Sequence, residues 1–546
     1  MTGVRLRSLV ARVDPVARSR WAGPVVAVVS LVAYWIQSLG WPLQRGRDFW
    51  DYLVFYLSYP DHHTPFQLVM LMRSPVTALS LGLPLDLAGA RGLEVVMALA
   101  YAGTVVAWGA VARHFSGVAA AVVVVLLLAN PLYALAFHEA SSDFVAATLF
   151  ALYALAVVRA WNEPTVARFA WVGGAVAALA LARPAYQALL LGVALPLLAP
   201  GVTRARLLRT GAFVACAVLP LVAWAVHNGI RYGDTTVSRA GKYNIPFYTA
   251  FRAGEIEAGN GPASAELGRL IQRDVLTLPP YRALHVDLAT YLDTRSNFEA
   301  SRLAGLVDHV DGVGSDYALL KKAALEVHGG GVRIAGVSLH RAVSESWNLA
   351  SNNAGHENRL HEVRRPPPPS AIIVAGRQVP NPAVLGIPEH GESYGFVACA
   401  AVAIADCILA HPEERYRNPA VARRYREITS RVRDWDAKVG TGTPRPFVSD
   451  KLAGIIRRLP APWWWAAIAL VALVWRRPQG WFALLWLVAA AGGMLVVHAI
   501  GVGPDLFYAL PVLPAWTVAA VCALLGRPGS PGSPGSDFSL RRRTGL

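Results

Sequence analysis

Long apolar segments separated by short polar ones dominate the chain. A helix needs about 20 apolar residues to cross the roughly 30 Å hydrocarbon core of a bilayer. The pattern predicts ten membrane-spanning helices, at residues 22–40, 93–112, 117–136, 143–160, 168–182, 185–200, 210–227, 462–475, 480–500 and 506–526. The predicted fold class is therefore an all-α polytopic membrane protein.

Residues 394–410 are almost long enough to form an eleventh span. A crossing there would reverse the sidedness of the spans that follow, so we interpret this stretch as an amphipathic helix at the membrane surface. The composition agrees with a membrane protein, since 54% of the 546 residues are hydrophobic, 16% are charged, and the mean hydropathy is +0.39. The four cysteines show no spacing typical of a disulfide framework or a metal site.

The net charge of +16 comes from basic residues that cluster between the apolar segments. Such clusters keep short loops on the cytoplasmic side of a membrane. With the arginine-rich N-terminus inside, the basic loops at Arg113–His114, Arg159–Arg168, Arg204–Arg209 and Arg476–Arg477 all fall inside, and so does the C-terminal tail. This distribution argues against nucleic-acid binding. Arg457 and Arg458 are the exception, because they precede a span on the predicted outer side.

This topology divides the chain into five parts. They are a cytoplasmic basic N-terminus (1–21), an N-terminal transmembrane module with acids in its outer loops (22–227), an extracytoplasmic segment with interfacial helices (228–461), the C-terminal transmembrane helices (462–526) and a disordered cytoplasmic tail (527–546).

Ionisable residues avoid the middles of the predicted spans and gather at their outer ends. A pump or a proton-coupled carrier would place them near the bilayer centre. The residues at outer ends or in outer loops are Asp48, Asp51, Asp61, His62, His63, Arg73, His138, Glu139, Asp143, Arg183, His227, His498 and Asp505. This one-sided distribution predicts binding or chemistry at the outer leaflet.

Two acidic motifs stand out in this set. Asp48 and Asp51 of "RDFWD" lie among aromatic residues in the first outer loop, either on one face of a short helix or as solvated loop acids. Glu139 and Asp143 form a second acidic site before a strong helix. Asp143 is alternatively an ordinary N-cap, a role that the neighbouring serines could also take.

Cations accompany these acids. Arg183 of "LARPAYQ" lies between two apolar segments, where an unpartnered cation costs about 2.5–3.5 kcal/mol. It therefore needs an anionic partner, which is Asp48, Asp143 or a lipid phosphate. The exit from the seventh span carries Arg231, Lys242 and Tyr243 with glycines that suit close approach of a phosphate, or it is an ordinary loop.

In this order, the motifs "RDFWD", "SSDF", "LARPAYQ", "HN…YGD…S…GKYN", "ADCILAHPEERY" and "D..YALPVLP" resemble those of the GT-C membrane glycosyltransferases, the group with the protein O-mannosyltransferases and the lipid A aminoarabinose transferases. The resemblance implies a bundle of about 10–13 transmembrane helices in a bacterial plasma membrane, with an extracytoplasmic active site. It implies a polyprenyl-phosphate sugar donor and a cell-envelope glycan, lipid or protein as acceptor, beside membrane lipids as partners.

The resemblance also implies roles for individual residues. Asp48, or Asp51, is the catalytic base, and Arg183, Arg231, Lys242 and Tyr243 hold the donor phosphate. An acceptor hydroxyl is a weak nucleophile, so a base must remove its proton, and a single displacement needs only one base. No cofactor is certain, no metal ligands are assigned, and a divalent metal stays open. The alternatives are a non-enzymatic flippase for a lipid-linked sugar and a cell-envelope scaffold.

Overall fold

The protein is predominantly helical, which confirms the all-α class. The structure is a computed structural model that describes residues 14–17, 19–46, 48–60, 64, 66–277, 281–282, 285–295, 297–351, 371–374, 377–380, 416–441, 446–501 and 508–527. Strands in these residues form two small sheets, one from β1 (Gln44–Arg45) and β2 (Glu139–Ala140), the other from β3 (Ala371–Val374) and β4 (Arg377–Pro380). The predicted surface helix at 394–410 and the tail beyond residue 527 lie outside the described residues.

Four described helices are long and apolar enough to cross a membrane. They are α5 (Pro75–Arg113), α8 (Ser142–Asn162), α11 (Thr203–Tyr232) and α25 (Trp481–Gly501). The bent pair α23 (Pro446–Arg458) and α24 (Pro462–Arg476) gives a fifth if it counts as one span. Shorter apolar helices are α2 (Ala22–Ser38), α6 (Gly117–Ala129), α9 (Val166–Ala182), η1 (Pro184–Val193) with α10 (Ala194–Leu198), and α26 (Pro514–Leu525). Each of the ten apolar segments predicted above overlaps one of these helices.

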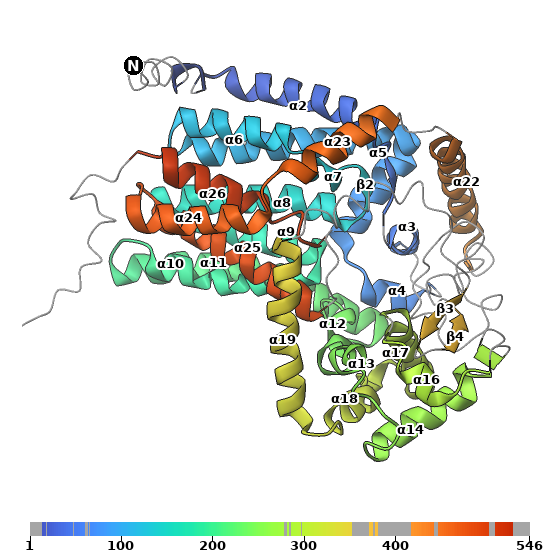
Figure 1. The fold of residues 1–546 in the computed structure, drawn as a ribbon. Helices are drawn as coiled ribbons and strands as arrows, with labels where there is room; N and C mark the ends of the chain where they lie inside the picture. The colour runs from blue at the N-terminus through green and yellow to red at the C-terminus, as the bar shows by residue number, and fades with distance from the viewer. Residues whose placement is uncertain are drawn as a thin grey trace, which may run out of the picture.

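These apolar helices lie side by side and form a bundle (Figure 1). At one end, the Ser116 hydroxyl donates to the Leu525 carbonyl at 2.9 Å, and the Gly117 amide donates to the Asp14 carboxylate at 2.7 Å. At the other end, the Thr77 hydroxyl donates to the Ala182 carbonyl at 2.8 Å. At the first end, the Arg527 amide also donates to the Phe115 carbonyl, and the Gln479 amide donates to the Arg527 carbonyl. The basic loops after α5 and after α24, which the sequence assigned to one side of the membrane, thus meet at one end of the bundle.

Helix α5 differs from its prediction because it begins 18 residues before the predicted span at 93–112. Its 39 residues would measure about 58 Å if straight, well beyond the thickness of a bilayer core. Gly89 has a φ of +65°, which breaks the helix between its two parts. The first part carries Asp86, which accepts a 2.9 Å hydrogen bond from the Tyr56 hydroxyl and pairs with Arg424 of α22 (Pro419–Thr441).

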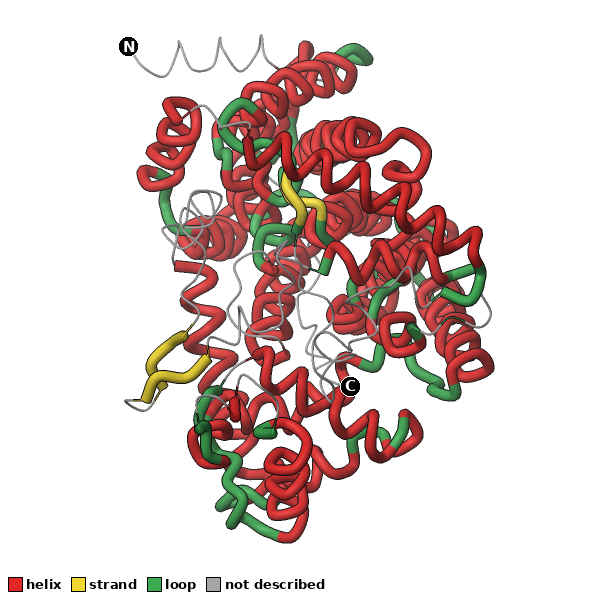
Figure 2. The backbone as a smooth tube through the Cα atoms, turned by 90° about the vertical axis from the view of Figure 1, so that its right-hand side faces the viewer, coloured by secondary structure: helices red, strands yellow, loops and turns green. Residues whose placement is uncertain are grey.

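A second hydrophobic core, separate from that of the bundle, is built from buried residues between Phe247 and Ile334. This part of the chain occupies the lower part of both views (Figures 1 and 2). We keep for it the name outer segment, after the side of the membrane that the sequence predicts. Its elements are α12 (Ala240–Tyr243), η2 (Asn244–Tyr248), α13 (Thr249–Ala253), α14 (Pro262–Leu270), η3 (Ile271–Val275), α16 (Leu288–Leu292), α17 (Asn297–Asp311), η4 (Val313–Ser315), α18 (Ala318–Leu325) and α19 (Gly330–Ser351).

The two ends of the bundle are expected to face opposite sides of the membrane. In a cysteine-free background, Tyr59→Cys and Thr165→Cys place single thiols at exposed positions near opposite ends. In intact cells, a membrane-impermeant thiol reagent should label one of these two thiols, and the other only after permeabilisation. Labelling of both without permeabilisation would contradict the two-ended arrangement.

Candidate functional site

The first outer loop is joined to the loop of the second acidic motif by the parallel pair β1–β2. The Gln44 amide donates to the His138 carbonyl at 3.0 Å, and the Gly46 amide donates to the Ala140 carbonyl at 3.1 Å. A Cβ at Gly46 would lie 2.5 Å from the Ser141 Cβ, so only glycine lets the two loops approach this closely. The two acidic motifs, about ninety residues apart in sequence, therefore share one site.

Asp48 and Asp51 bind the same guanidinium, that of Arg73. Asp48 precedes the buried helix α3 (Phe49–Ser58) and has a left-handed φ of 59°, while Arg73 directly follows α4 (Gln67–Met72). Arg73 donates from Nη1 and Nη2 to the two Asp48 oxygens at 3.0 and 2.9 Å. It also donates from Nε to Asp51 Oδ2 at 2.8 Å and contacts Asp51 through Nη2. Such bidentate pairs are strong and fix geometry.

The two carboxylates differ in exposure. The Asp51 side chain is 3% exposed, and that of Asp48 is 37% exposed. Of the two alternatives for these acids, that of solvated loop acids is therefore wrong for Asp51, because α3 buries nearly all of its side chains. Burial alone would lower the pKa of Arg73, but Asp48 and Asp51 raise it above its usual value, so the guanidinium stays charged.

The second acidic motif holds Arg183. Arg183 donates from Nη1 to Asp143 Oδ1 at 2.6 Å, so Asp143 is the described partner of this cation among the three alternatives considered. Ser141 is the N-cap of α8 and donates to Asp143 Oδ2 at 3.0 Å. The N-cap alternative for Asp143 is thus wrong. The Arg183 guanidinium also lies 4.1 Å from the ring centre of Tyr508, the tyrosine of "D..YALPVLP".

Tyr52 connects the two ion-pair clusters. Its side chain is buried on α3, and the charges of Arg73, Asp48 and Arg183 all act on its phenol, which also hydrogen-bonds the Ser142 side chain. Burial raises the pKa of Tyr52 to about 12, so the phenol keeps its proton at neutral pH. The Arg73 guanidinium lies 5.7 Å from the Tyr52 ring centre, and the β1–β2 pair joins the two loops, so we treat Asp48, Asp51, Arg73, Asp143 and Arg183 as one ion-pair site.

Glu139 and His138 lie next to this site. Glu139 is 5% exposed on β2, and its Cγ would be 2.7 Å from a Cβ at Gly46. His138 is fully buried and stacks on Tyr34 with ring centres 4.4 Å apart. Its Nε2 lies 3.4 Å from Gln37 Oε1. Burial lowers the pKa of His138 to about 3, so this imidazole is neutral at physiological pH.

Lys242, one of the three predicted phosphate-binding residues after the seventh span, takes part in a second ion-pair cluster. Lys242 binds Asp234 at 2.6 Å and Asp316 at 2.7 Å. Asp234 also accepts from the fully buried Arg239 at 2.6 Å, and Arg239 pairs with Asp308 of α17. Lys242 thus meets acids of its own loop and of the outer segment. Arg231 lies near the end of α11 with its guanidinium 5.6 Å from the Tyr232 ring centre, and Tyr243 ends α12.

This second cluster reaches the ion-pair site through the backbone. The Arg239 amide donates to the Leu71 carbonyl at 2.8 Å, and the Ser238 hydroxyl donates to the Met72 carbonyl at 3.0 Å. These contacts hold the end of α4, immediately before Arg73. The loop containing Lys242 is therefore adjacent to the chain segment that carries Arg73. Asp61, His62, His63 and Asp505 lie outside the described residues.

Sequence reasoning assigned no role to Arg73 or Tyr508, and it expected Tyr52 only as one of the aromatic residues that surround the first acidic motif. Arg73 was one of the ionisable residues at the outer ends of the predicted spans, and Tyr508 belonged to a quoted motif. The sequence therefore singled out both residues but did not predict what they contact. In the part of the chain that the structure describes, no group of three or more His, Cys, Asp or Glu side chains is arranged to hold a metal ion. Comparisons with family models, curated proteins and solved structures gave no match.

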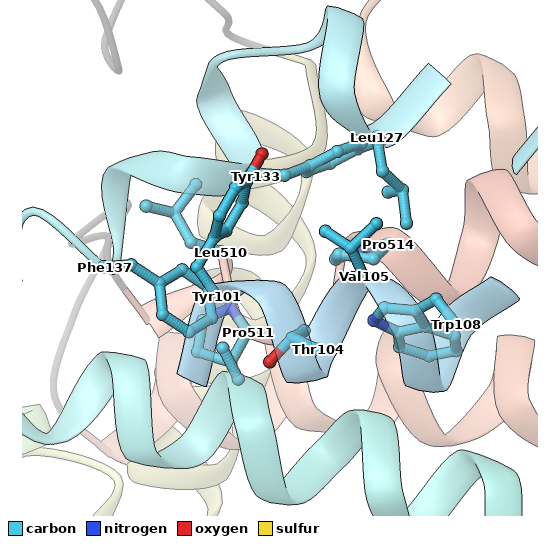
Figure 3. A pocket seen from close by; sticks show the side chains of 11 residues that line it. Tyr101, Thr104, Val105, Trp108, Leu127, Tyr133, Phe137, Leu510, Pro511 and Pro514 are labelled. Atoms are coloured by element: carbon cyan, nitrogen blue, oxygen red, sulfur yellow. The ribbon is translucent and has the colours of Figure 1, made fainter. Parts of the chain in front are cut away.

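The interior of the bundle contains a cavity of about 10 Å³ between α5, α6, α8 and the start of α26 (Figure 3). Tyr101, Thr104, Tyr133 and Phe137 are among the side chains that surround it. This volume holds about one water molecule, so the cavity has no room for a sugar or a lipid chain.

We expect Gly46→Ala to destabilise the ion-pair site, because the new Cβ would overlap Ser141 and Glu139. Overpacking of this kind typically costs about 1–3 kcal/mol. The matched control is Gly174→Ala in α9, where no atom lies within 4 Å of the added Cβ. Thermal unfolding in detergent should show a lower midpoint for Gly46→Ala and an unchanged or higher one for the control.

We expect His138 to make the fold acid-sensitive. Its pKa is lowered from 6.5 to about 3 in the folded protein, so protonation favours the unfolded chain as the pH falls below 6.5. Between pH 6.5 and pH 5 this linkage removes about 2 kcal/mol of stability. His138→Phe keeps an aromatic ring beside Tyr34 and should reduce the loss of thermal stability over this pH interval. An equally steep loss in the variant would contradict the assignment.

Proposed function

We propose that this protein is a membrane glycosyltransferase of the GT-C type, which moves a sugar from a polyprenyl-phosphate donor to an acceptor hydroxyl. The observation that carries the proposal is the ion-pair site. It joins residues from four distant segments, Asp48–Asp51, Arg73, Asp143 and Arg183, at one end of an apolar helical bundle. A lipid-linked substrate requires this combination of charged groups and an apolar surround.

Asp48 is the better candidate for the base. Its side chain is 37% exposed, whereas that of Asp51 is 3% exposed and therefore inaccessible to an acceptor. Asp51 instead keeps Arg73 in place. Asp48 can accept a proton only when its ion pair with Arg73 loosens, because a paired carboxylate is a weaker base. A donor phosphate that approaches Arg73 would compete with Asp48 and loosen this pair.

Arg73 and Arg183 are the cations that would face the leaving phosphate. The glycosidic bond breaks with growth of negative charge on the phosphate oxygen, and cations already in place stabilise that charge most where water is scarce. Arg183 is 7% exposed and held by both Asp143 and Tyr508, so its position is fixed before a substrate enters. The neighbouring loop region contains Lys242, Tyr243 and Arg231. These residues remain candidates for binding the phosphate oxygens that face away from Arg73 and Arg183.

The proposal places the ion-pair site on the extracytoplasmic side of a bacterial plasma membrane, with all ten apolar segments as spans. Two findings support this arrangement. The basic loops after α5 and after α24 meet at the end of the bundle that bears Asp14 and Leu525, and the two acidic loops are joined to each other at the opposite end. Basic loops are retained in the cytoplasm. The acceptor would then be a glycan, lipid or protein of the cell envelope.

Replacing the base should abolish transfer and leave the fold intact. We expect Asp48→Asn to lower the transfer rate by about 10²–10⁴-fold, because the acceptor hydroxyl loses its proton acceptor while the amide can still accept from Arg73. The measurement is turnover of radiolabelled polyprenyl-phosphate sugars by the purified protein in nanodiscs. Glu266→Gln in α14 is the matched control, since Glu266 is half-exposed and pairs only with the exposed Arg269 in the structure.

The same assay separates the proposal from its alternatives. If the unaltered protein transfers a sugar and the Asp48→Asn variant transfers it at the same rate, Asp48 is not the base. Binding of the lipid-linked sugar without turnover of any of the sugars tested, or transport across the bilayer, would replace the enzyme with a flippase or a scaffold.

A further inference from the structure

A polar cleft of about 370 Å³ lies in the outer segment between α13 and α19. Its charged lining consists of Arg252, Glu255, Arg333, His340, Arg341 and Glu345. None of these residues belongs to the ion-pair site. An inference about this cleft therefore does not depend on the proposed glycosyltransferase activity.

The charges of the cleft do not cancel. Three arginines face two glutamates, so the lining carries a net charge of +1 with His340 neutral. Arg333 pairs with Glu255 at 2.7 Å. Arg252 donates to a backbone carbonyl, that of Arg295, at 3.1 Å and supplies the excess positive charge.

Arg341 is the least satisfied of these cations. Its side chain is 8% exposed, and its Nη1 has no hydrogen-bond partner in the described structure. Its contacts with Glu345, at 3.2 Å from Nε and 3.5 Å from Nη2, are long for a charge-assisted pair. A buried guanidinium donor without a partner is costly, so the cleft favours an anion that accepts from Arg341.

The apolar side of α19 indicates where this anion comes from. Val332, Leu339 and Val343 are seven and four residues apart, which places them on one face, and all three are at least 65% exposed. Trp347 extends this face, and the centre of its ring lies 5.5 Å from that of Trp463, at the start of α24. We name these four α19 residues the α19 apolar face.

Helix α19 packs against α25 and crosses the direction of the bundle helices at their end (Figure 1). A helix in this position, with tryptophans at its junction with an apolar helix, is typical of the membrane–water interface. The α19 apolar face then continues the lipid-facing surface of the bundle, where Val471, Val474 and Trp475 of α24 are exposed.

We propose that the cleft between α13 and α19 binds the phosphate of an anionic membrane lipid, whose acyl chains start on the α19 apolar face. The headgroup reaches around α19 to the cleft, because Arg341 lies two residues from Leu339 and from Val343 and therefore on the other side of the helix. Arginine suits this ligand because its planar donors match two phosphate oxygens. Arg341 supplies the buried donor, and Arg252 supplies the second positive charge. Glu345 competes with the phosphate for Arg341.

The test uses purified full-length protein in a neutral detergent, mixed with equal amounts of phosphatidylglycerol and phosphatidylcholine. Intact-protein mass spectrometry counts the lipids that stay bound. We expect a preference for phosphatidylglycerol that falls at least about tenfold in Arg341→Gln and in Arg252→Gln, the loss of one charge-assisted contact. Glu345→Gln should strengthen the preference, because it removes the competing carboxylate.

Two controls keep the result specific. Arg273→Gln removes an exposed arginine of the same outer segment, which pairs with Asp274 outside the cleft, and should change nothing. If Arg341→Gln does not elute as a monodisperse protein, Arg252→Gln and Glu345→Gln decide the outcome, since their side chains are only partly buried.

Three results would overturn the proposal. One is equal retention of both lipids by the unaltered protein. Another is a phosphatidylglycerol preference that Arg252→Gln and Glu345→Gln leave unchanged. The third is that the protein retains no lipid but binds inorganic phosphate in equilibrium dialysis, and that Arg252→Gln removes this binding. That result would assign the cleft to a free phosphate.

Discussion

The pairing of buried charges at the end of an apolar bundle is the constraint on which the site depends. A lone charge in such surroundings costs several kcal/mol, and a pair repays this cost only with precise geometry and further hydrogen bonds. Arg73 satisfies this condition with two carboxylates and Arg183 with one carboxylate and an aromatic ring. Each pair joins segments that lie far apart in the sequence, so the pairs also determine which loops meet.

The outer segment takes part in this arrangement because it anchors α4. Arg239 is fully buried, pairs with Asp234 and Asp308, and donates its backbone amide to Leu71. The position of Arg73, one residue beyond α4, therefore depends on the contact between the seventh-span exit and α17. Breaking a buried pair of this kind typically costs about 3–5 kcal/mol because it leaves an uncompensated charge. The ion-pair site is thus supported by the bundle on one side and by the outer segment on the other.

The sequence was sufficient to predict where the apolar helices lie, but it was not sufficient to predict which charged residues pair with each other. Apolar length is a local property, so all ten apolar segments could be recognised and each one overlaps a helix. The early start of α5 was missed because Gly89 and Pro84 interrupt its pattern. Asp48, Asp51, Asp143 and Arg183 could be selected because charges next to apolar segments are conspicuous. Their pairing could not be chosen, since it depends on contacts across 22 to 40 residues, and the β1–β2 pair is only two residues long.

The two sites differ in the sign of their excess charge, and this difference bears on what each can hold. The ion-pair site has three carboxylates for two guanidiniums, whereas the cleft between α13 and α19 has three guanidiniums for two carboxylates. A phosphate can enter the ion-pair site only by displacing a carboxylate from an arginine. Asp48 is the most exposed carboxylate there, so it is the one that displacement would release. The cleft already has one more guanidinium than carboxylates, and there a phosphate competes only with Glu345 for Arg341. Exchange at the first site suits a ligand that must leave after reaction, and the excess of positive charge at the second suits a ligand that stays bound.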